Sequence, residues 1–451
     1  MTLPENFIAQ MQHILGADYP AFVESLQRET PTAIRLNAHK KVSDGSLFGQ
    51  NLEPVKWNTD GRYLPKRPSF TLDPAFHAGA YYVQEASSMF VAEAIKQTLD
   101  LDKPLKIMDL CAAPGGKTTL LASLLNPRSL LVANEVIKSR IGPLKENLEK
   151  WGFPNYIVSN HDPEEMIDLE GFFDFVLTDA PCSGEGLFRK DPKASKEWSE
   201  AAVQLCSARQ KRILQAAAMM VAPNGYLCYS TCTYNAQENE QNALWLTQTA
   251  DFEEVKLNIS AKWGIVAKAM GYQFYPHRLE GEGFYLAVFK KIRGEKQEAR
   301  GKIKFNRVPQ KKVDLLRKWL AAPESFEFYE KPEGAIVAIP ANLINEYATV
   351  FRALQKRSSG LEIGQFKGDD FIPSHDLALS TAIATDLPAI ELLKDDALKF
   401  LKKENINIEN AQNGWLLARY AGLNLGFMKV IGSRINNYLP KEWRIRMDIP
   451  E

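Results

Sequence analysis

Short apolar runs alternate with helical segments between about residues 100 and 290, and this alternation restricts the fold more than any other feature of the sequence. Segments such as 138–152 and 195–223 repeat apolar residues at helical spacing. The runs that they separate are KIMDL (106–110), SLLVANE (129–135), YIVSNHD (156–162), FFDFVLTDAP (172–181) and GYLCYSTCTY (225–234). Strands alternating with longer helices form βαβ units, so we expect an α/β domain with a mainly parallel sheet and helices on both faces. After residue 250, two strand-like runs flank LEGEGFY and predict an antiparallel hairpin at the edge of the sheet.

The length of 451 residues predicts two to four domains, at roughly one to two hundred residues each. We expect an N-terminal α+β subdomain, the α/β domain, a basic linker with an intermediate domain, and a small β-rich module, at residues 1–100, 101–292, 293–375 and 376–451. The segment 290–312 holds ten Lys or Arg against two Glu. It is either a solvated linker or a surface for an anionic partner.

Composition excludes several classes of protein. With 45% apolar and 24% charged residues, the chain is neither mainly disordered nor fibrous. No apolar run approaches the roughly 18 residues of a membrane span, and we expect no signal peptide. Five cysteines without a CxxC pair disfavour disulfides and structural zinc, so we expect a reduced, cytoplasmic protein that binds no metal, and a monomer by default. Equal numbers of acidic and basic residues, 55 of each, do not exclude nucleic acid, because net charge says nothing about patches.

The turn CAAPGGKTT (111–119) joins the first strand to a helix, where open α/β sheets bind ligands. A P-loop would need glycine where Cys111 stands, and the dinucleotide fingerprint G-x-G-x-x-G is absent. Gly115 and Gly116 would let a ligand approach the backbone closely. The remaining alternatives are a nucleoside-thioether cofactor such as S-adenosylmethionine and a tight turn that binds nothing.

Two acids fit the cofactor interpretation. Glu135 ends the second predicted strand, where an acid would bind the ribose hydroxyls. Asp162 ends the third, where we expect it to address the adenine or its amino group.

Two of the cysteines follow strand ends on the same edge of the predicted sheet. Cys182 lies in DAPCSGEG after the fourth strand, and Cys232 lies in STCTY after the fifth. A metal site is disfavoured because no further His or Cys lies nearby in the sequence to complete the ligand set. A redox dithiol is disfavoured because such a pair usually occurs as CxxC on one turn. We interpret Cys206 and Cys228 as small buried hydrophobic residues.

Covalent chemistry gives two thiols a specific use. Carbon 5 of a pyrimidine becomes nucleophilic only when a thiolate adds to carbon 6, and a second group must then remove the carbon 5 proton. A thiolate needs nearby positive charge, which Lys117 could supply. Asp179 could bond the exocyclic amine and ring nitrogen of cytosine and so select it over uracil.

At these residues the chain resembles the Sun (NSUN) family of RNA 5-methylcytosine methyltransferases. The matching elements are MDLCAAPGGKTT, the acid of NEV, DAPCSGEG, STCTY and GEGFYLAVFKK, with IRLN (Arg35, Asn37) and YYVQEASS (Tyr82, Gln84, Ser88) upstream. The resemblance covers roughly residues 30–290 and implies a class I, Rossmann-like methyltransferase domain that uses S-adenosyl-L-methionine.

The resemblance also implies roles for single residues. Cys232 corresponds to the nucleophile, and Cys182 to the cysteine that assists release of the methylated product, with Asp179 and Lys117 beside them. The residues implied to line the cofactor and base pocket are Cys111, Ala112, Ala113, Pro114, Gly115, Gly116, Lys117, Glu135, Asp162 and Asp179. Arg189 and Lys190 receive no role.

The C-terminal segment 414–447 is similar to the PUA-like RNA-binding module of the RsmF-type bacterial branch of that family, which modifies cytidines of small-subunit ribosomal RNA. This similarity implies RNA contacts from Lys429, Asn437, Lys441 and Arg444, and an RNA-recognition role for residues 1–100.

The expected activity is therefore methylation of cytosine carbon 5 in 16S ribosomal RNA or the 30S subunit, with S-adenosyl-L-methionine as cofactor. The same chemistry on transfer RNA and a catalytically inactive RNA-binding assembly factor remain as alternatives. A P-loop ATPase is disfavoured by Cys111.

Overall fold

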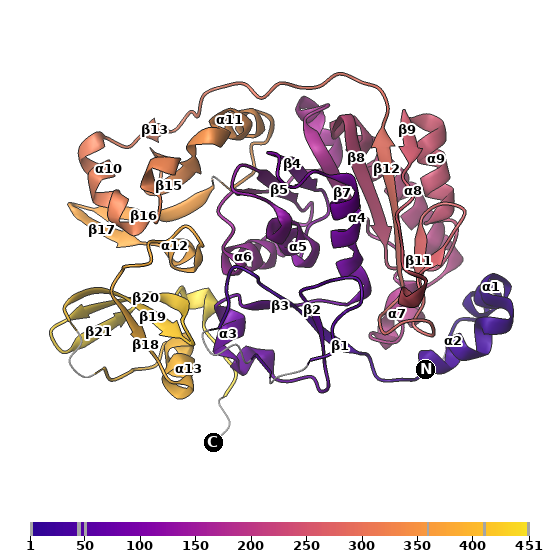
Figure 1. Ribbon diagram of the computed structural model, residues 1–451, viewed down its shortest axis with the longest axis horizontal. Coiled ribbons are helices and arrows are strands. Elements are labelled where there is room, and N and C mark those ends of the chain that lie inside the picture. The colour runs from indigo at the N-terminus through magenta and orange to yellow at the C-terminus, as the bar shows by residue number, and fades with distance from the viewer. Residues whose placement is uncertain (1–2, 43–46, 49–51, 359, 409–411, 449–451) are drawn as a thin grey trace.

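The computed structural model describes residues 3–42, 47–48, 52–358, 360–408 and 412–448, and its centre is a mixed sheet of nine described strands (Figure 1). The parallel strands are β4 (Lys106–Asp109), β5 (Leu130–Asn134), β6 (Tyr156–Ser159), β7 (Phe173–Asp179) and β8 (Val221–Thr231). The antiparallel strands are β9 (Phe252–Glu254), β10 (Val266–Ala267), β11 (Tyr272–Phe274) and β12 (Phe284–Lys291). The order β10-β11-β12-β8-β7-β4-β5-β6 confirms the predicted α/β sheet, and β11 pairs with β12 as the predicted antiparallel hairpin.

Different helices cover the two faces of this sheet, because its side chains alternate between two separate cores. Ile107 and Leu131 pack into the core on one face, and their neighbours Met108 and Val132 pack into the core on the other. The first face is covered by α4 (Val91–Thr98), α5 (Gly116–Leu124) and α6 (Ile141–Trp151). The second is covered by α8 (Glu200–Met220), α9 (Glu240–Thr249) and α11 (Ile344–Ala353).

Helix α11 fills a gap in the second face. The connection between β6 and β7 is a short 3₁₀ segment, Pro163–Leu169, where parallel strands usually have a crossover helix. Tyr347 and Val350 of α11 share the second core with Phe172. The Tyr347 hydroxyl donates a hydrogen bond to the Tyr156 carbonyl at 3.4 Å. The segment expected as an intermediate domain therefore packs into the core of the α/β domain.

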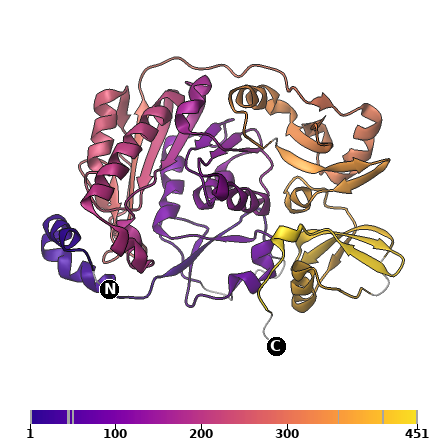
Figure 2. The same cartoon turned by 180° about the vertical axis from the view of Figure 1, so that it is seen from behind.

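That segment contains a second, antiparallel sheet. Its strands are β13 (Asn306–Arg307), β14 (Phe326–Glu330), β15 (Ala335–Pro340), β16 (Leu361–Lys367) and β17 (Asp370–Pro373), with helices α10 (Gln310–Leu316) and α12 (His375–Leu379). The basic segment that precedes it crosses from β12 to β13 (Figures 1 and 2). It is anchored on the way by hydrogen bonds from Gln297 N to the Gly171 carbonyl at 3.0 Å and from Arg300 N to Thr349 Oγ1 at 2.9 Å.

The two ends of the chain pack against each other. The N-terminal elements are α1 (Glu5–Leu15), α2 (Tyr19–Ser25), β1 (Thr32–Leu36), β2 (Gly61–Leu64), α3 (Pro74–His77) and β3 (Tyr81–Val83). The C-terminal elements are β18 (Ala389–Glu391), α13 (Lys394–Lys402), β19 (Gly414–Tyr420), β20 (Leu423–Ile431) and β21 (Arg434–Asn437). Ile34 and Tyr81 share a core with Phe400 and Leu416, and the C-terminal module lies beside α3 in both views (Figures 1 and 2). Across the described ranges, no helix is both long and apolar enough to span a bilayer.

Candidate active site

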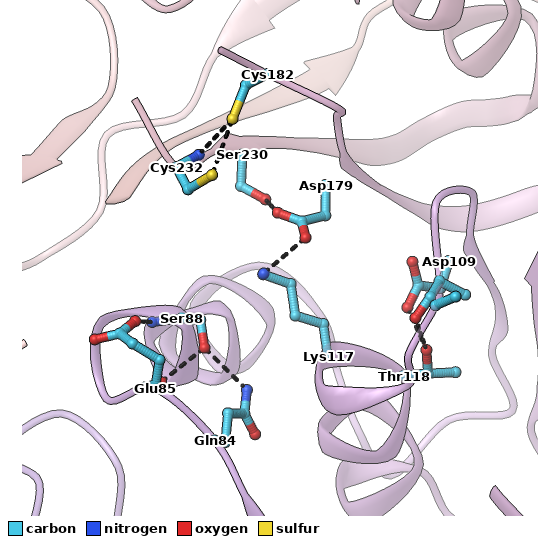
Figure 3. A network of polar contacts seen from close by, with 12 residues as sticks. Gln84, Glu85, Ser88, Asp109, Lys117, Thr118, Asp179, Cys182, Ser230 and Cys232 are labelled. Atoms are coloured by element: carbon cyan, nitrogen blue, oxygen red, sulfur yellow. Dashed lines mark hydrogen bonds and ion pairs between the residues drawn. The ribbon is translucent and has the colours of Figure 1, made fainter. Parts of the chain in front are cut away.

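The candidate residues gather at the carboxyl edge of the parallel strands. Strand order reverses between β4 and β7, and the crevice at such a switch point is the usual ligand site of an open α/β sheet. Lys117, Asp179, Cys182, Ser230 and Cys232 converge there from α5 and from the ends of β7 and β8 (Figure 3).

The glycine turn after β4 ends at the first residue of α5. Gly115 has φ +115°, and a side chain there would meet Asn147 Cβ at 3.2 Å, so this position favours glycine. No side chain of the described residues caps α5, which leaves its first N–H groups available to a ligand. Thr118 Oγ1 donates to Asp109 Oδ2 at 2.6 Å and fixes the turn to the end of β4.

Glu135 is held where the sequence predicted an acid, directly after β5. Only 3% of the residue is exposed, and its carboxylate accepts a hydrogen bond from Ile137 N at 2.8 Å. Arg140 Nη1 lies 3.2 Å from Glu135 Oε2, and Arg140 Nη2 donates to the Ala113 carbonyl. Arg140 thus ties the acid to the glycine turn, a connection that the sequence analysis missed.

Asp162 lies farther from the sheet than predicted. β6 ends at Ser159, and Asp162 caps the following 3₁₀ segment, where it accepts from Glu164 N. Its carboxylate also pairs with Arg212 on α8 at 3.0 Å. The expectation that Asp162 ends the third strand is therefore wrong by three residues, because the backbone leaves the sheet for the capped turn.

Lys117 and Asp179 form an ion pair across the switch point. Lys117 Nζ lies 2.8 Å from Asp179 Oδ2, and Ser230 Oγ donates to Asp179 Oδ1 at 2.7 Å. Burial lowers the pKa of Lys117, but the ion pair and hydrogen bond with Asp179, together with attraction to Cys232 and Asp109, outweigh burial and leave the pKa above its ordinary value. The ammonium therefore stays charged, beside a carboxylate held by two donors.

The two candidate cysteines face each other (Figure 3). Cys182 Sγ lies 3.0 Å from Cys232 Sγ, and Cys232 N donates to Cys182 Sγ at 3.3 Å. The hydrogen bond with Cys232 and burial raise the pKa of the Cys182 thiol well above its usual range. The Cys182 thiol therefore stays protonated while it contacts Cys232.

Two buried glutamates hold the loops that carry these cysteines. Glu238 accepts from the backbone and hydroxyl of Ser183, and from Gln210 Nε2 at 2.7 Å. Glu185 accepts from Thr233 Oγ1 at 2.6 Å and from two backbone N–H groups of the loop after β8. Neither role was predicted from the sequence, although acidic residues beside DAPCSG and TCTY were a visible signal.

The other cysteines and the unassigned arginine have structural surroundings. Cys228 is fully buried in β8, as predicted, whereas Cys206 on α8 is half-buried and that expectation is wrong. Burial raises the pKa of Cys111 well above its ordinary value, so this thiol stays protonated. Arg189 forms a buried ion pair with Glu282 at 3.0 Å.

Because Asp109 is buried, we expect the stability of the folded protein to depend on pH. Its Oδ1 is buried without a hydrogen-bond partner in the described part of the chain, and burial raises its pKa from 3.8 to about 7. Between these two values the folded state binds more protons than the unfolded state. Neutral Asp109 therefore contributes its full stability below about pH 4. That contribution is lost as the pH rises through about 7.

Asp109→Asn should remove this loss, which is at most about 1.4 kcal/mol per pH unit within the window. Urea unfolding of both proteins between pH 4 and 8 measures the difference. Equal pH slopes for the variant and the wild type would contradict it.

Three family models match the chain. They are 16S rRNA methyltransferase RsmB/F at residues 96–290, the N-terminal domain of 16S rRNA methyltransferase RsmF at residues 3–86, and the methyltransferase RsmF PUA domain at residues 387–445.

Curated relatives match over almost the whole length. Ribosomal RNA small subunit methyltransferase F of Vibrio vulnificus (strain YJ016) is 30% identical, over 98% of this chain and 97% of that protein. The protein of the same name from Vibrio cholerae serotype O1 (strain M66-2) is 31% identical, over 98% of both chains.

Solved structures match the methyltransferase part. A methyltransferase homolog protein from Pyrococcus horikoshii has a TM-score of 0.55 at 28% identity, over 64% of this chain and 95% of that one. NSun6 from Pyrococcus horikoshii, solved with SFG, has a TM-score of 0.54 at 20% identity, over 64% of this chain and 99% of that one, and shows the fold. By these matches, the chain belongs to the RsmF family of S-adenosylmethionine-dependent 16S rRNA methyltransferases.

Proposed function

We propose that the chain methylates carbon 5 of a cytidine in 16S rRNA, through an adduct between Cys232 and carbon 6 that Cys182 helps to resolve. The observation that carries the proposal is the pair of sulfurs 3.0 Å apart, with Cys232 directly after β8 and Cys182 three residues after the end of β7. Carbon 5 methylation requires a nucleophile and a later base at one pyrimidine ring. Two adjacent sulfurs supply both.

The cofactor pocket fits S-adenosyl-L-methionine. The uncapped start of α5 suits the amino-acid part, and Glu135 retains lone pairs to accept the ribose hydroxyls. When bound, the cofactor supplies an electrophilic methyl group. The residues proposed to hold it are 111–117, Glu135, Asp162 and Asp179, of which Asp162 has the weakest support because Arg212 engages it.

The ion pair between Lys117 and Asp179 would orient the base. Each oxygen of Asp179 accepts one hydrogen bond within the protein, so lone pairs remain for the exocyclic amine of cytosine. Uracil has a carbonyl at that position and would be repelled. The charged Lys117 would stabilise the negative charge that develops on the ring when the thiolate adds.

The thiols would ionise in sequence. Cys232 attacks carbon 6 as a thiolate while Cys182 remains a thiol, since the hydrogen bond with Cys232 is the largest cause of its raised pKa. Once the Cys232 sulfur is bonded to carbon, that hydrogen bond to a thiolate is lost and the pKa of Cys182 falls. Cys182 can then lose its own proton to solvent. After carbon 5 has taken the methyl group, the Cys182 thiolate takes the proton from carbon 5, and the double bond re-forms as the Cys232 thiolate leaves.

The C-terminal module would hold the RNA. Lys441 and Arg444 are exposed, and Lys429 lies 5.3 Å from the centre of the Trp415 ring and 3.8 Å from Asp370. Asn437 is less suited to RNA contact, because its amide donates to the Phe400 carbonyl and accepts from Leu439 N. A paired cytidine hides carbon 6, so the target must be unpaired or flipped out, at a cost of a few kcal/mol that these contacts would offset.

Transfer of labelled methyl groups to three substrates tests the proposal: 30S subunits, protein-free 16S rRNA and bulk transfer RNA. We expect label in 16S rRNA, in 5-methylcytidine, in at least one of the first two. Label in transfer RNA alone would agree with the proposed methylation chemistry but would contradict 16S rRNA as the substrate. Cofactor binding without transfer to any of the three would favour an inactive RNA-binding factor.

A further inference from the structure

A cavity of about 350 Å³ lies where the basic segment 301–305 crosses α11, away from the cysteines. Its cationic lining residues are Lys302, Lys304, Arg352 and Arg357, and its apolar ones include Ile303, Phe305 and Phe351. None of the described residues that line it is acidic. The cavity therefore combines positive charge with aromatic surface.

The protein builds this cavity with specific contacts. Arg300 N donates to Thr349 Oγ1 at 2.9 Å, and Thr349 Oγ1 donates to the Arg300 carbonyl at 3.0 Å. Gly301 has φ +141°, and a side chain there would lie 3.0 Å from Ala348 Cβ, so its absence allows the segment to approach α11 closely. These contacts fix the position of the lysines that follow.

Arg357 carries an uncompensated charge inside this cavity. Its guanidinium lies 3.8 Å from the centre of the Phe351 ring and 6.0 Å from that of Phe305. It forms no ion pair with a described carboxylate. Its Nη2 donates to the Phe351 carbonyl at 3.5 Å, and its Nε is buried without a partner among the described residues. Burial lowers the pKa of Arg357. A partly buried guanidinium without an acidic partner destabilises the fold unless an anion from outside the protein pairs with it. The planar N–H donors of a guanidinium match the geometry of a phosphate.

The cavity lies beside the cofactor edge of the sheet. Arg357 forms an antiparallel bridge with Ser159 at the end of β6, and Asn160 N donates to the Lys356 carbonyl at 2.9 Å. The Asn160 side chain donates in turn to the Glu135 carbonyl at 2.6 Å. The segment 356–358 thus extends the sheet past β6. It lies five strand intervals from β8, or about 24 Å at about 4.8 Å each, which is within reach of an RNA strand that has its target base at Cys232.

We propose that this cavity binds one nucleotide of the single-stranded RNA a few nucleotides away from the target, with its phosphate at Arg357 and its base against Phe305. Lys302, Lys304 and Arg352 attract the neighbouring phosphates. A base stacked on an aromatic ring beside a guanidinium is the usual way in which proteins hold unpaired RNA. The inference rests on the proposed function for the identity of the partner as RNA, and it assigns a second RNA surface outside the C-terminal module.

The test compares Arg357→Gln with Arg317→Gln in the full-length protein. Arg317 is an exposed arginine paired with Asp314, and it serves as the matched control because it lies outside the cavity, residues 1–100 and the C-terminal module. Binding of protein-free 16S rRNA is measured by filter retention from 50 to 300 mM salt. Arg357→Gln should weaken binding about tenfold and reduce the slope of log affinity against log salt by about 0.7, the value for one single-strand phosphate. Arg317→Gln should change neither.

Photocrosslinking of the wild-type protein to 16S rRNA containing 4-thiouridine keeps the test independent of how the variant folds. Cross-links to peptides containing Phe305 or Phe351 are expected, and their absence would overturn the proposal. An unchanged salt slope in Arg357→Gln would also overturn it. If that variant bound 16S rRNA normally but lost binding to 30S subunits, an acidic protein segment would be the occupant instead.

Methyl transfer by the wild type, measured in the same samples, separates this inference from the proposed function. Binding that depends on Arg357 without any methyl transfer would keep this site and remove the enzyme assignment. Methyl transfer together with RNA binding that does not depend on Arg357 would keep the enzyme assignment and remove this site.

Discussion

Replacing Cys232 with serine should lower methyl transfer to 16S rRNA by about 10⁴-fold or more, as removal of a covalent nucleophile does in other enzymes. A serine hydroxyl does not ionise near neutral pH, so no adduct forms at carbon 6 and carbon 5 stays unreactive. The substitution removes no group that holds the glycine turn or Glu135. S-adenosylmethionine should therefore still bind, and calorimetry measures this beside the transfer assay.

Cys206→Ser is the matched control for this variant, because Cys206 is a half-buried thiol on α8 that follows no strand end. It should keep near-normal turnover. Substantial turnover by Cys232→Ser would contradict the assignment of Cys232 as nucleophile.

Cys182→Ala should trap the enzyme on its RNA. Cys232 would still add to carbon 6, and carbon 5 would still be methylated. The variant would lack the Cys182 sulfur, which lies 3.0 Å from the Cys232 sulfur and is proposed to remove the carbon 5 proton. We expect a protein–RNA species that survives denaturing electrophoresis, in stoichiometric yield, and at most one methyl group transferred per enzyme.

The double variant Cys182→Ala/Cys232→Ala should form no such species, which shows that the trapped bond is to Cys232. If Cys182→Ala gave no adduct and Cys232→Ala alone trapped one, the two roles would be reversed.

The alternation of strands and helices between residues 100 and 290 predicted the sheet well, because buried parallel strands are continuous apolar runs that the sequence displays directly. Strand ends were less visible. Asp162 follows an apolar run, yet the chain leaves the sheet at Ser159 to form a capped turn. β8 begins at Val221, inside a segment that looked helical, because an apolar residue at a helix end fits either structure.

Long-range contacts explain what the sequence could not predict. Nothing near residues 344–353 indicates that α11 replaces a crossover helix between β6 and β7, since that role depends on the short connection at 163–169. The basic segment after β12 could have been a solvated linker or a surface for an anionic partner, and hydrogen bonds to Gly171 and Thr349 hold it against the fold.

In the site, too, some residues could be predicted from the sequence and others could not. Lys117, Asp179, Cys182 and Cys232 lie in recognisable motifs at the carboxyl edge of the sheet, and the fold brings them together as expected. The carboxylates of Glu185 and Glu238 act through buried hydrogen bonds to loops about 50 residues away in sequence, as Glu185 does to Tyr234. Such partners are set by packing and cannot be read from spacing alone.

Release of tritium from 16S rRNA labelled at carbon 5 of cytidine tests the central claim most directly. Methylation at carbon 5 must displace the hydrogen there, so we predict one tritium released for each methyl group transferred, with neither event in Cys232→Ser. Methyl incorporation with the tritium retained would place the methyl group on another atom, and would contradict the adduct mechanism and the roles of both cysteines.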